Sequence, residues 1–148
     1  MKLTQQIETD FKTAYKAKDT VKVAVLRMLK TAMTNRVKDL GRELEDGEVL
    51  DLVSKEVKQR KESIDQFGKA NRVDLVAVEE AELAVLETYL PTPLTEDELA
   101  AAVDAAVAET GAGSMQDMGR VMQALAAAHK GRYDGRRASE IVRSRLTG

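Results

Sequence analysis

The chain has 148 residues, the length of one domain or of two small ones. Hydrophobic residues make up 43% and charged residues 32%, a balance that excludes a disordered acidic tail and a membrane protein. Only 3% of the residues are aromatic and two are proline, so neither a β-sandwich nor a barrel nor a doubly wound sheet is expected. No cysteine is present, which excludes disulfides, thiol nucleophiles and cysteine zinc sites.

The formal net charge of −2 conceals an uneven distribution of charge along the chain. Residues 1–40 carry nine basic and four acidic side chains, and residues 115–148 carry seven and three. In contrast, residues 41–90 carry seven basic and thirteen acidic side chains, and residues 91–114 carry five acidic and no basic ones. Two basic ends therefore flank an acidic middle, a pattern that can mark a surface for a polyanion.

The first 90 residues have the apolar periodicity of amphipathic helices. Asp19 is placed to cap the second of these helices, and Gly41 to end it in a left-handed conformation. Pro91 and Pro93 end the fourth helix, because proline disfavours the helical conformation in the residue before it. The four expected helices are Thr4 to about Ala17, Asp19 to Gly41, Asp46 or Gly47 to about Phe67, and Asn71 to Leu90.

Three shorter, alanine-rich helices are expected after the prolines. Thr95 and Glu98 form a capping-box pattern at the start of the fifth helix, expected over Leu99 to about Glu109. Ser114 is expected to cap a sixth helix, and a seventh completes the chain.

The fold class that follows is all-α, with a four-helix N-terminal domain (1–90) and a small three-helix C-terminal domain (94–148). No apolar stretch approaches the roughly 18 residues of a membrane span, and the polar N-terminus lacks the apolar core of a signal peptide. We therefore expect a soluble, cytoplasmic protein with no membrane partner.

Residues that could carry catalysis or bind a metal are few. His129 is the sole histidine and lies at a predicted helix C-terminus, where an interaction with unpaired carbonyl groups accounts for it. The Gly111–Ser114 segment could bind an anion before a helix, but is interpreted as a plain turn. Surface charges are interpreted as solvated, including the Glu56–Arg60 pair and the carboxylates near Glu82. We expect no catalytic residue, no metal and no cofactor.

The most informative feature is an arginine-rich cluster near the C-terminus. Arginine suits phosphate because its planar fork donates two parallel hydrogen bonds, and a tyrosine can stack on an exposed base. Gly131 would let the chain turn there, and Asp134 would cap the last helix. The alternative is an ordinary solvated patch with the tyrosine packed inward. The candidate RNA-binding residues are Arg120, Lys130, Arg132, Tyr133, Arg136, Arg137 and Arg143.

Four short motifs, in order along the chain, resemble the YqeY family. They are Val57-Lys58-Gln59-Arg60, Tyr89-Leu90-Pro91, Met118-Gly119-Arg120-Val121-Met122 and Lys130-Gly131-Arg132-Tyr133-Asp134-Gly135. The C-terminal part also resembles the tail domain of GatB, a subunit of the tRNA-dependent amidotransferase. Two positions depart from the family pattern, with Tyr133 where alanine is more usual and Asn71 where glycine is common.

The resemblance implies a helical domain followed by a three-helix domain that touches tRNA. It also implies kinship with a carbon–nitrogen ligase that uses glutamine as amido donor. In that enzyme the glutaminase nucleophile and the phosphorylating site lie outside the part that this chain resembles. We therefore expect a non-catalytic module that binds tRNA or an amidotransferase-like assembly. The alternatives are a protein-interaction or scaffold module with no RNA role, and an enzyme that acts on glutamine.

Overall fold

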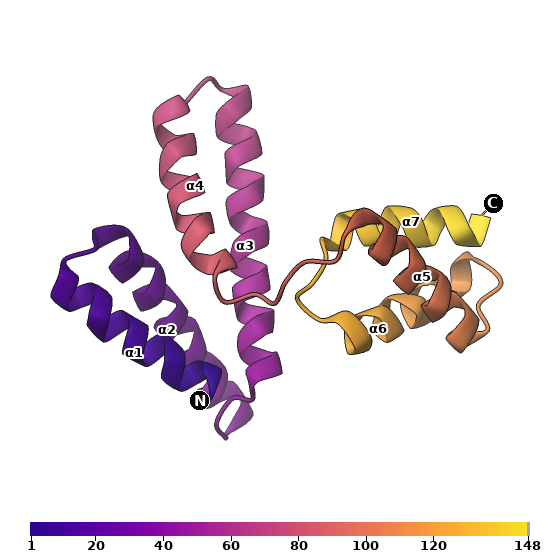
Figure 1. The fold of residues 1–148 in the computed structure, drawn as a ribbon, viewed down its shortest axis with the longest axis horizontal. Coiled ribbons are helices and arrows are strands. Elements are labelled where there is room, and N and C mark those ends of the chain that lie inside the picture. The colour runs from indigo at the N-terminus through magenta and orange to yellow at the C-terminus, as the bar shows by residue number, and fades with distance from the viewer. Residues whose placement is uncertain (148) are drawn as a thin grey trace. The chain divides into compact units, whose positions relative to one another are not determined.

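The computed structural model describes residues 1–147, and within them the chain is helical with no strand (Figure 1). This confirms the all-α class. The chain divides into two compact units, Met1–Leu90 and Pro91–Gly148, called unit 1 and unit 2 below. Unit 1 contains α1 (Leu3–Ala17), α2 (Thr20–Leu40), α3 (Asp46–Lys69) and α4 (Val73–Glu87). Unit 2 contains α5 (Glu96–Thr110), a short 3₁₀ turn η1 (Met115–Asp117), α6 (Met118–His129) and α7 (Gly135–Thr147).

The ends of the unit 1 helices follow local side-chain chemistry. The Lys22 amide donates to Asp19 Oδ1 at 3.1 Å, which confirms the predicted cap of α2. Gly41 then ends α2 at a φ of +70°, a conformation that glycine adopts without steric cost. The start of α3 lies at Asp46, where Glu45 and Glu48 form a capping box that the sequence did not indicate.

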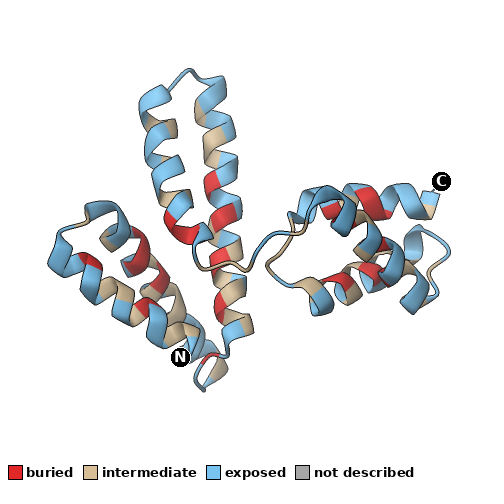
Figure 2. Cartoon of the chain, viewed as in Figure 1, coloured by how far each residue is buried: buried red, intermediate tan, exposed pale blue. Residues whose placement is uncertain are grey.

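The core of unit 1 is aliphatic and is drawn from all four helices (Figure 2). Tyr89, just after α4, packs against this core and donates its hydroxyl to Asp10 Oδ2 of α1 at 2.6 Å. The last turn of this unit is thereby tied to its first helix. The buried core residues are Ile7, Val25, Leu26, Leu29, Leu44, Val49, Val53, Val57, Val85 and Leu86.

One charged side chain lies inside unit 1. Arg60 of α3 is only 8% exposed, and its guanidinium pairs with Glu56 one turn earlier and with Glu82 and Glu79 of α4 at 3.4 and 3.9 Å. Its Nη2 also lies 3.3 Å from the sulfur of Met28 on α2. The prediction that these charges are solvated is therefore wrong: three carboxylates share one buried guanidinium.

In unit 2, α5 begins earlier than the hydrophobic pattern predicts. The Glu98 amide donates to Thr95 Oγ1 at 3.1 Å and the Thr95 amide to Glu98 Oε1 at 2.9 Å, so the capping box is confirmed and the first helical residue is Glu96. Ser114 is followed by η1 rather than directly by α6, which starts at Met118. The buried core of unit 2 comprises Leu99, Val103, Ala106, Val121, Leu125, Ala138, Ile141 and Val142.

Candidate nucleic-acid interface

Most candidate residues of unit 2 lie at the turn between α6 and α7, whereas Arg120 lies near the start of α6 and Arg143 further along α7. The chain leaves α6 at His129, and Gly131 adopts a φ of +76°, which lets the Arg132 amide return to the His129 carbonyl at 3.0 Å. Asp134 stands at the start of α7, where its carbonyl accepts from the Ala138 amide at 3.0 Å. Its carboxylate also accepts from the Arg136 amide at 3.4 Å. Gly131 thus lies at a left-handed position in the turn, and Asp134 lies directly before α7.

Arg132 and Tyr133 turn toward the protein rather than toward solvent. Arg132 Nε donates to the Thr92 carbonyl at 2.8 Å, and the Arg132 carbonyl accepts from the Leu94 amide at 2.7 Å. These bonds fasten the segment that leads into α5 to the α6–α7 turn. Tyr133 packs against the core of unit 2, and burial raises the pKa of its phenol. Its ring is half-buried, which leaves only part of it able to stack on a base.

Two arginines of α7 form ion pairs with α5 in a regular register. Arg137 pairs with Glu96, and Arg145 Nε pairs with Asp104 Oδ1 at 2.7 Å. Each pair is separated by 41 residues, and both partners advance by eight, so α5 and α7 run parallel. The hydrogen bonds that Arg137 donates to Glu96 and then to Glu140 raise the pKa of its guanidinium above the ordinary value. The charge of both arginines is thus compensated within unit 2.

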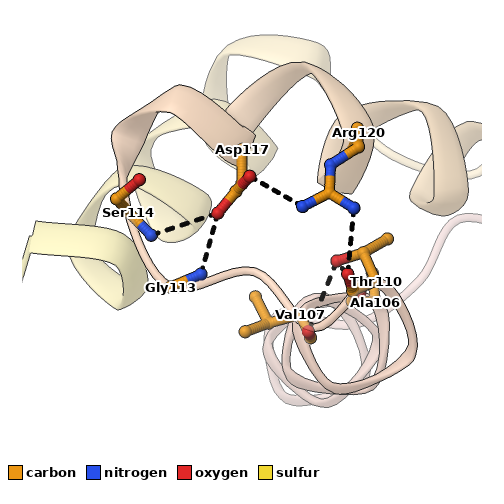
Figure 3. A network of polar contacts seen from close by, with 7 residues as sticks. All are labelled: Ala106, Val107, Thr110, Gly113, Ser114, Asp117 and Arg120. Carbon is orange, nitrogen blue, oxygen red and sulfur yellow. Dashed lines mark hydrogen bonds and ion pairs between the residues drawn. The ribbon is translucent and has the colours of Figure 1, made fainter.

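Arg120 serves the loop between α5 and α6 (Figure 3). Its guanidinium donates to the Thr110 carbonyl at 3.1 Å and to Asp117 Oδ1 at 2.7 Å. The other oxygen of Asp117 accepts from the amides of Gly113 and Ser114 at 2.9 and 3.3 Å, bonds visible in the same view. The Gly113 bond, followed by the Arg120 bond, lowers the pKa of Asp117. The two amides that could receive a foreign anion are thus already bound to the chain's own carboxylate.

Arg136 and Arg143 remain as the cations available to a ligand. Both are exposed, and within residues 1–147 no carboxylate lies within ion-pair distance of either guanidinium. They are seven residues apart on α7 and so share one helical face, about 10.5 Å apart along the axis. Lys130 is also exposed in the turn before α7. The structure therefore divides the predicted arginines into two groups. Arg120, Arg132 and Arg137 bind other groups of unit 2, whereas Arg136 and Arg143 are exposed without a carboxylate partner in residues 1–147.

Two further properties bear on the kind of site. In the part of the chain that the structure describes, no group of three acidic or histidine side chains is arranged to hold a metal ion. None of the helices in residues 1–147 is long and apolar enough to cross a membrane.

The geometry describes a two-unit helical protein with a basic face on its last helix. Comparison with known proteins gives its family: residues 4–146 match the family described as Yqey-like protein, and the chain belongs to it. This confirms the resemblance seen in the sequence motifs.

Curated relatives cover the chain only in part. The chain is 39% identical over 85 residues to "Altered inheritance of mitochondria protein 41, mitochondrial" of Lachancea thermotolerans, which is 57% of this chain and 46% of the relative. Proteins of the same name match from Eremothecium gossypii, at 38% over 103 residues (67% and 56%), and from Saccharomyces cerevisiae strain YJM789, at 34% over 85 residues (57% and 46%). The chain thus spans about half the length of the curated relatives it matches.

These names correct one expectation. The sequence led us to expect a cytoplasmic protein. The comparison contradicts this expectation, because the matched relatives are mitochondrial proteins by name.

Proposed function

We propose that this chain is a non-catalytic module that binds tRNA through the exposed basic face of unit 2. The observation that carries the proposal is the pair Arg136 and Arg143, two exposed guanidiniums on one face of α7 with no carboxylate partner in the described residues. Each can donate two parallel hydrogen bonds to a phosphate. The likeness to the GatB tail domain supports tRNA as the RNA.

The arginines of the cluster have two different roles, which their contacts within unit 2 distinguish. Arg132 binds the Thr92 carbonyl before α5 and Arg137 pairs with Glu96 of α5, so both shape the surface. Arg136 and Arg143 supply the uncompensated charge that an RNA backbone requires. Contacts of this kind fix position without reading sequence, which suits a module that assists an assembly in holding tRNA.

The test is fluorescence anisotropy of the full chain with labelled bulk tRNA at several salt concentrations. Loss of two phosphate contacts in Arg136→Gln/Arg143→Gln should flatten the log affinity–log salt slope by about 1.4 to 1.8. Arg145→Gln is the matched control for Arg143→Gln, because both remove one charge from α7 but Arg145 is already paired with Asp104. Equal affinity losses in these two single variants would contradict the proposal.

A complementary experiment increases the number of unpaired arginines on α7 instead of reducing it. Asp104→Asn releases Arg145 from its α5 partner and should tighten tRNA binding while steepening its salt dependence. Glu96→Gln should have a smaller effect, because Arg137 keeps its ion pair with Glu140. Far-UV circular dichroism verifies that each variant is folded. Retention of a protein partner at high salt, together with no tRNA affinity in the wild type, would instead favour the scaffold alternative.

A further inference from the structure

Unit 1 carries a second basic surface that the C-terminal cluster does not explain. An open groove of about 440 Å³ runs along α2 beside α1. From α1 it is lined by Phe11. From α2 it is lined by Arg27, Lys30, Thr31, Thr34, Asn35 and Lys38.

The α2 side of this groove follows from helical spacing. Its six residues recur at intervals of three and four, so they form one stripe that extends about 16.5 Å from Arg27 to Lys38. No carboxylate lines the groove, although Glu8 of α1 pairs with Lys30 at 3.1 Å. Arg27 and Lys38 are exposed and have no carboxylate partner in residues 1–147. The stripe therefore retains uncompensated positive charge.

Two aromatic side chains of α1, Phe11 and Tyr15, lie next to each other near this stripe. The Lys30 ammonium lies 4.2 Å from the centre of the Phe11 ring and the Arg27 guanidinium 5.9 Å from it, so the ring orients both cations. Tyr15, one turn along α1, has its ring centre 6.2 Å from that of Phe11 and is 63% exposed. Tyr15 does not line the groove, but its exposed ring adjoins Phe11, which does. Proteins stack the bases of single strands on exposed aromatic rings next to cationic grooves.

The groove could bind either an acidic peptide helix or a nucleic-acid backbone, and its lining residues favour the nucleic acid. An acidic peptide helix would need apolar pockets for its anchoring side chains, and the only apolar lining residue, Phe11, already faces two cations. The hydroxyls of Thr31 and Thr34 donate to backbone carbonyls of their own helix, which leaves the cations and Asn35 as outward donors. Such donors suit phosphate and sugar oxygens.

We infer that the α1–α2 groove binds the phosphodiester backbone of a single-stranded nucleic acid, with Arg27 and Lys38 on phosphates and Tyr15 stacked on a base. All residues of this site belong to unit 1, whereas the residues of the proposed tRNA-binding face belong to unit 2. A ligand with unpaired bases would use the groove, whereas a regular duplex would present no base to Tyr15.

The experiment measures binding of a labelled 12-nucleotide single-stranded RNA to the full chain. Under counterion release each phosphate contact contributes about 0.7 to the salt slope, which corresponds to about fivefold in affinity at 0.1 M salt relative to 1 M. Arg27→Gln/Lys38→Gln should therefore weaken binding about 25-fold and flatten the slope by about 1.4. Tyr15→Ala should weaken binding about fivefold or more without changing the slope.

The matched control is Lys58→Gln/Lys61→Gln, which removes the same charge from exposed positions of α3 in the same unit. Circular dichroism confirms the fold of every variant. Equal losses in the groove variant and this control would overturn the inference, because the effect would then be one of net charge.

Two other results would also overturn it. One is that Arg136→Gln/Arg143→Gln abolishes binding of the 12-nucleotide RNA while the groove variant leaves it intact, which would spare the proposed function. The other is that a deca-glutamate peptide binds more tightly than the RNA and loses affinity in the groove variant, which would identify an acidic protein partner. If the groove variant loses affinity for the 12-nucleotide RNA but still binds tRNA normally, the result would support the groove as a binding site distinct from the proposed tRNA-binding face.

Discussion

Replacement of Arg60 by methionine tests the buried ion network of unit 1. Methionine retains the length and apolar stem of arginine but removes the charge that faces Glu56, Glu79 and Glu82. At an effective dielectric constant near 20, two opposite unit charges about 4 Å apart attract by about 4 kcal/mol. Loss of the guanidinium removes an attraction of about this size to each of the three carboxylates.

The net destabilisation is smaller than the sum of these attractions. Removal of one member of a buried ion pair costs about 3–5 kcal/mol, because the remaining charge stays partly desolvated. The three glutamate side chains keep 14%, 22% and 22% of their surface exposed, so water compensates part of the loss. We therefore expect Arg60→Met to lower the free energy of unfolding of unit 1 by about 3 kcal/mol, near the lower end of that range.

The assay is hydrogen exchange of the α3 and α4 amides in the full chain, which reports unit 1 separately from unit 2. Removing the orphaned charges should restore stability, so Arg60→Met/Glu56→Gln/Glu82→Gln is expected to be more stable than Arg60→Met alone. A cost below about 1 kcal/mol for Arg60→Met, or a further loss on adding the glutamine substitutions, would refute the reasoning.

Three further predictions concern single groups. The hydrogen bond from Arg42, followed by that from the Glu45 amide, lowers the pKa of Glu48 from 4.5 to about 2. This carboxylate therefore stabilises the fold above pH 4.5 and loses that contribution as the pH falls toward 2. An NMR titration of Glu48 should give the low midpoint, and Glu48→Gln should abolish this pH dependence of stability. Burial and the hydrogen bond to Asp10 raise the pKa of Tyr89 above 10, so its contribution is complete below pH 10 and lost at higher pH, and Tyr89→Phe should cost about 1.5 kcal/mol in urea unfolding. Gly131→Ala should destabilise unit 2 by about 1–2 kcal/mol in the same assay, because its φ of +76° places a Cβ against the following carbonyl oxygen.

The helices were predictable because their signals are local. Asp19, Gly41 and the Thr95–Glu98 pair each act within one turn of their own position, so the residues that specify these helix ends can be read directly from the sequence. The cap formed by Glu45 was missed because glutamate is not a preferred N-cap residue.

The burial of Arg60 could not be predicted in the same way. Glu56 lies four residues before it, and this spacing is typical of a solvated surface pair. The pair becomes buried because α4 packs against α3 and brings Glu79 and Glu82, about 20 residues further along the chain, to the same guanidinium. Helical periodicity within α3 contains no information about that packing.

The candidate interface illustrates how helix register selects which arginines can reach a ligand. In α7, Arg137 and Arg145 are eight residues apart and meet Glu96 and Asp104, which are also eight apart on the parallel helix α5.

Arg136 and Arg143 have the same chemistry and lie one and two residues away from these paired arginines, but on a different face of α7, where α5 presents no carboxylate. A count of basic residues over 115–148 therefore overstates the positive field of unit 2, because acidic residues of 91–114 compensate part of it. The same reasoning applies to α2, where Glu8 compensates Lys30 but leaves Arg27 and Lys38 uncompensated. In both units, affinity for a polyanion should follow the number of unpaired cations on one helical face, not the net charge of the segment.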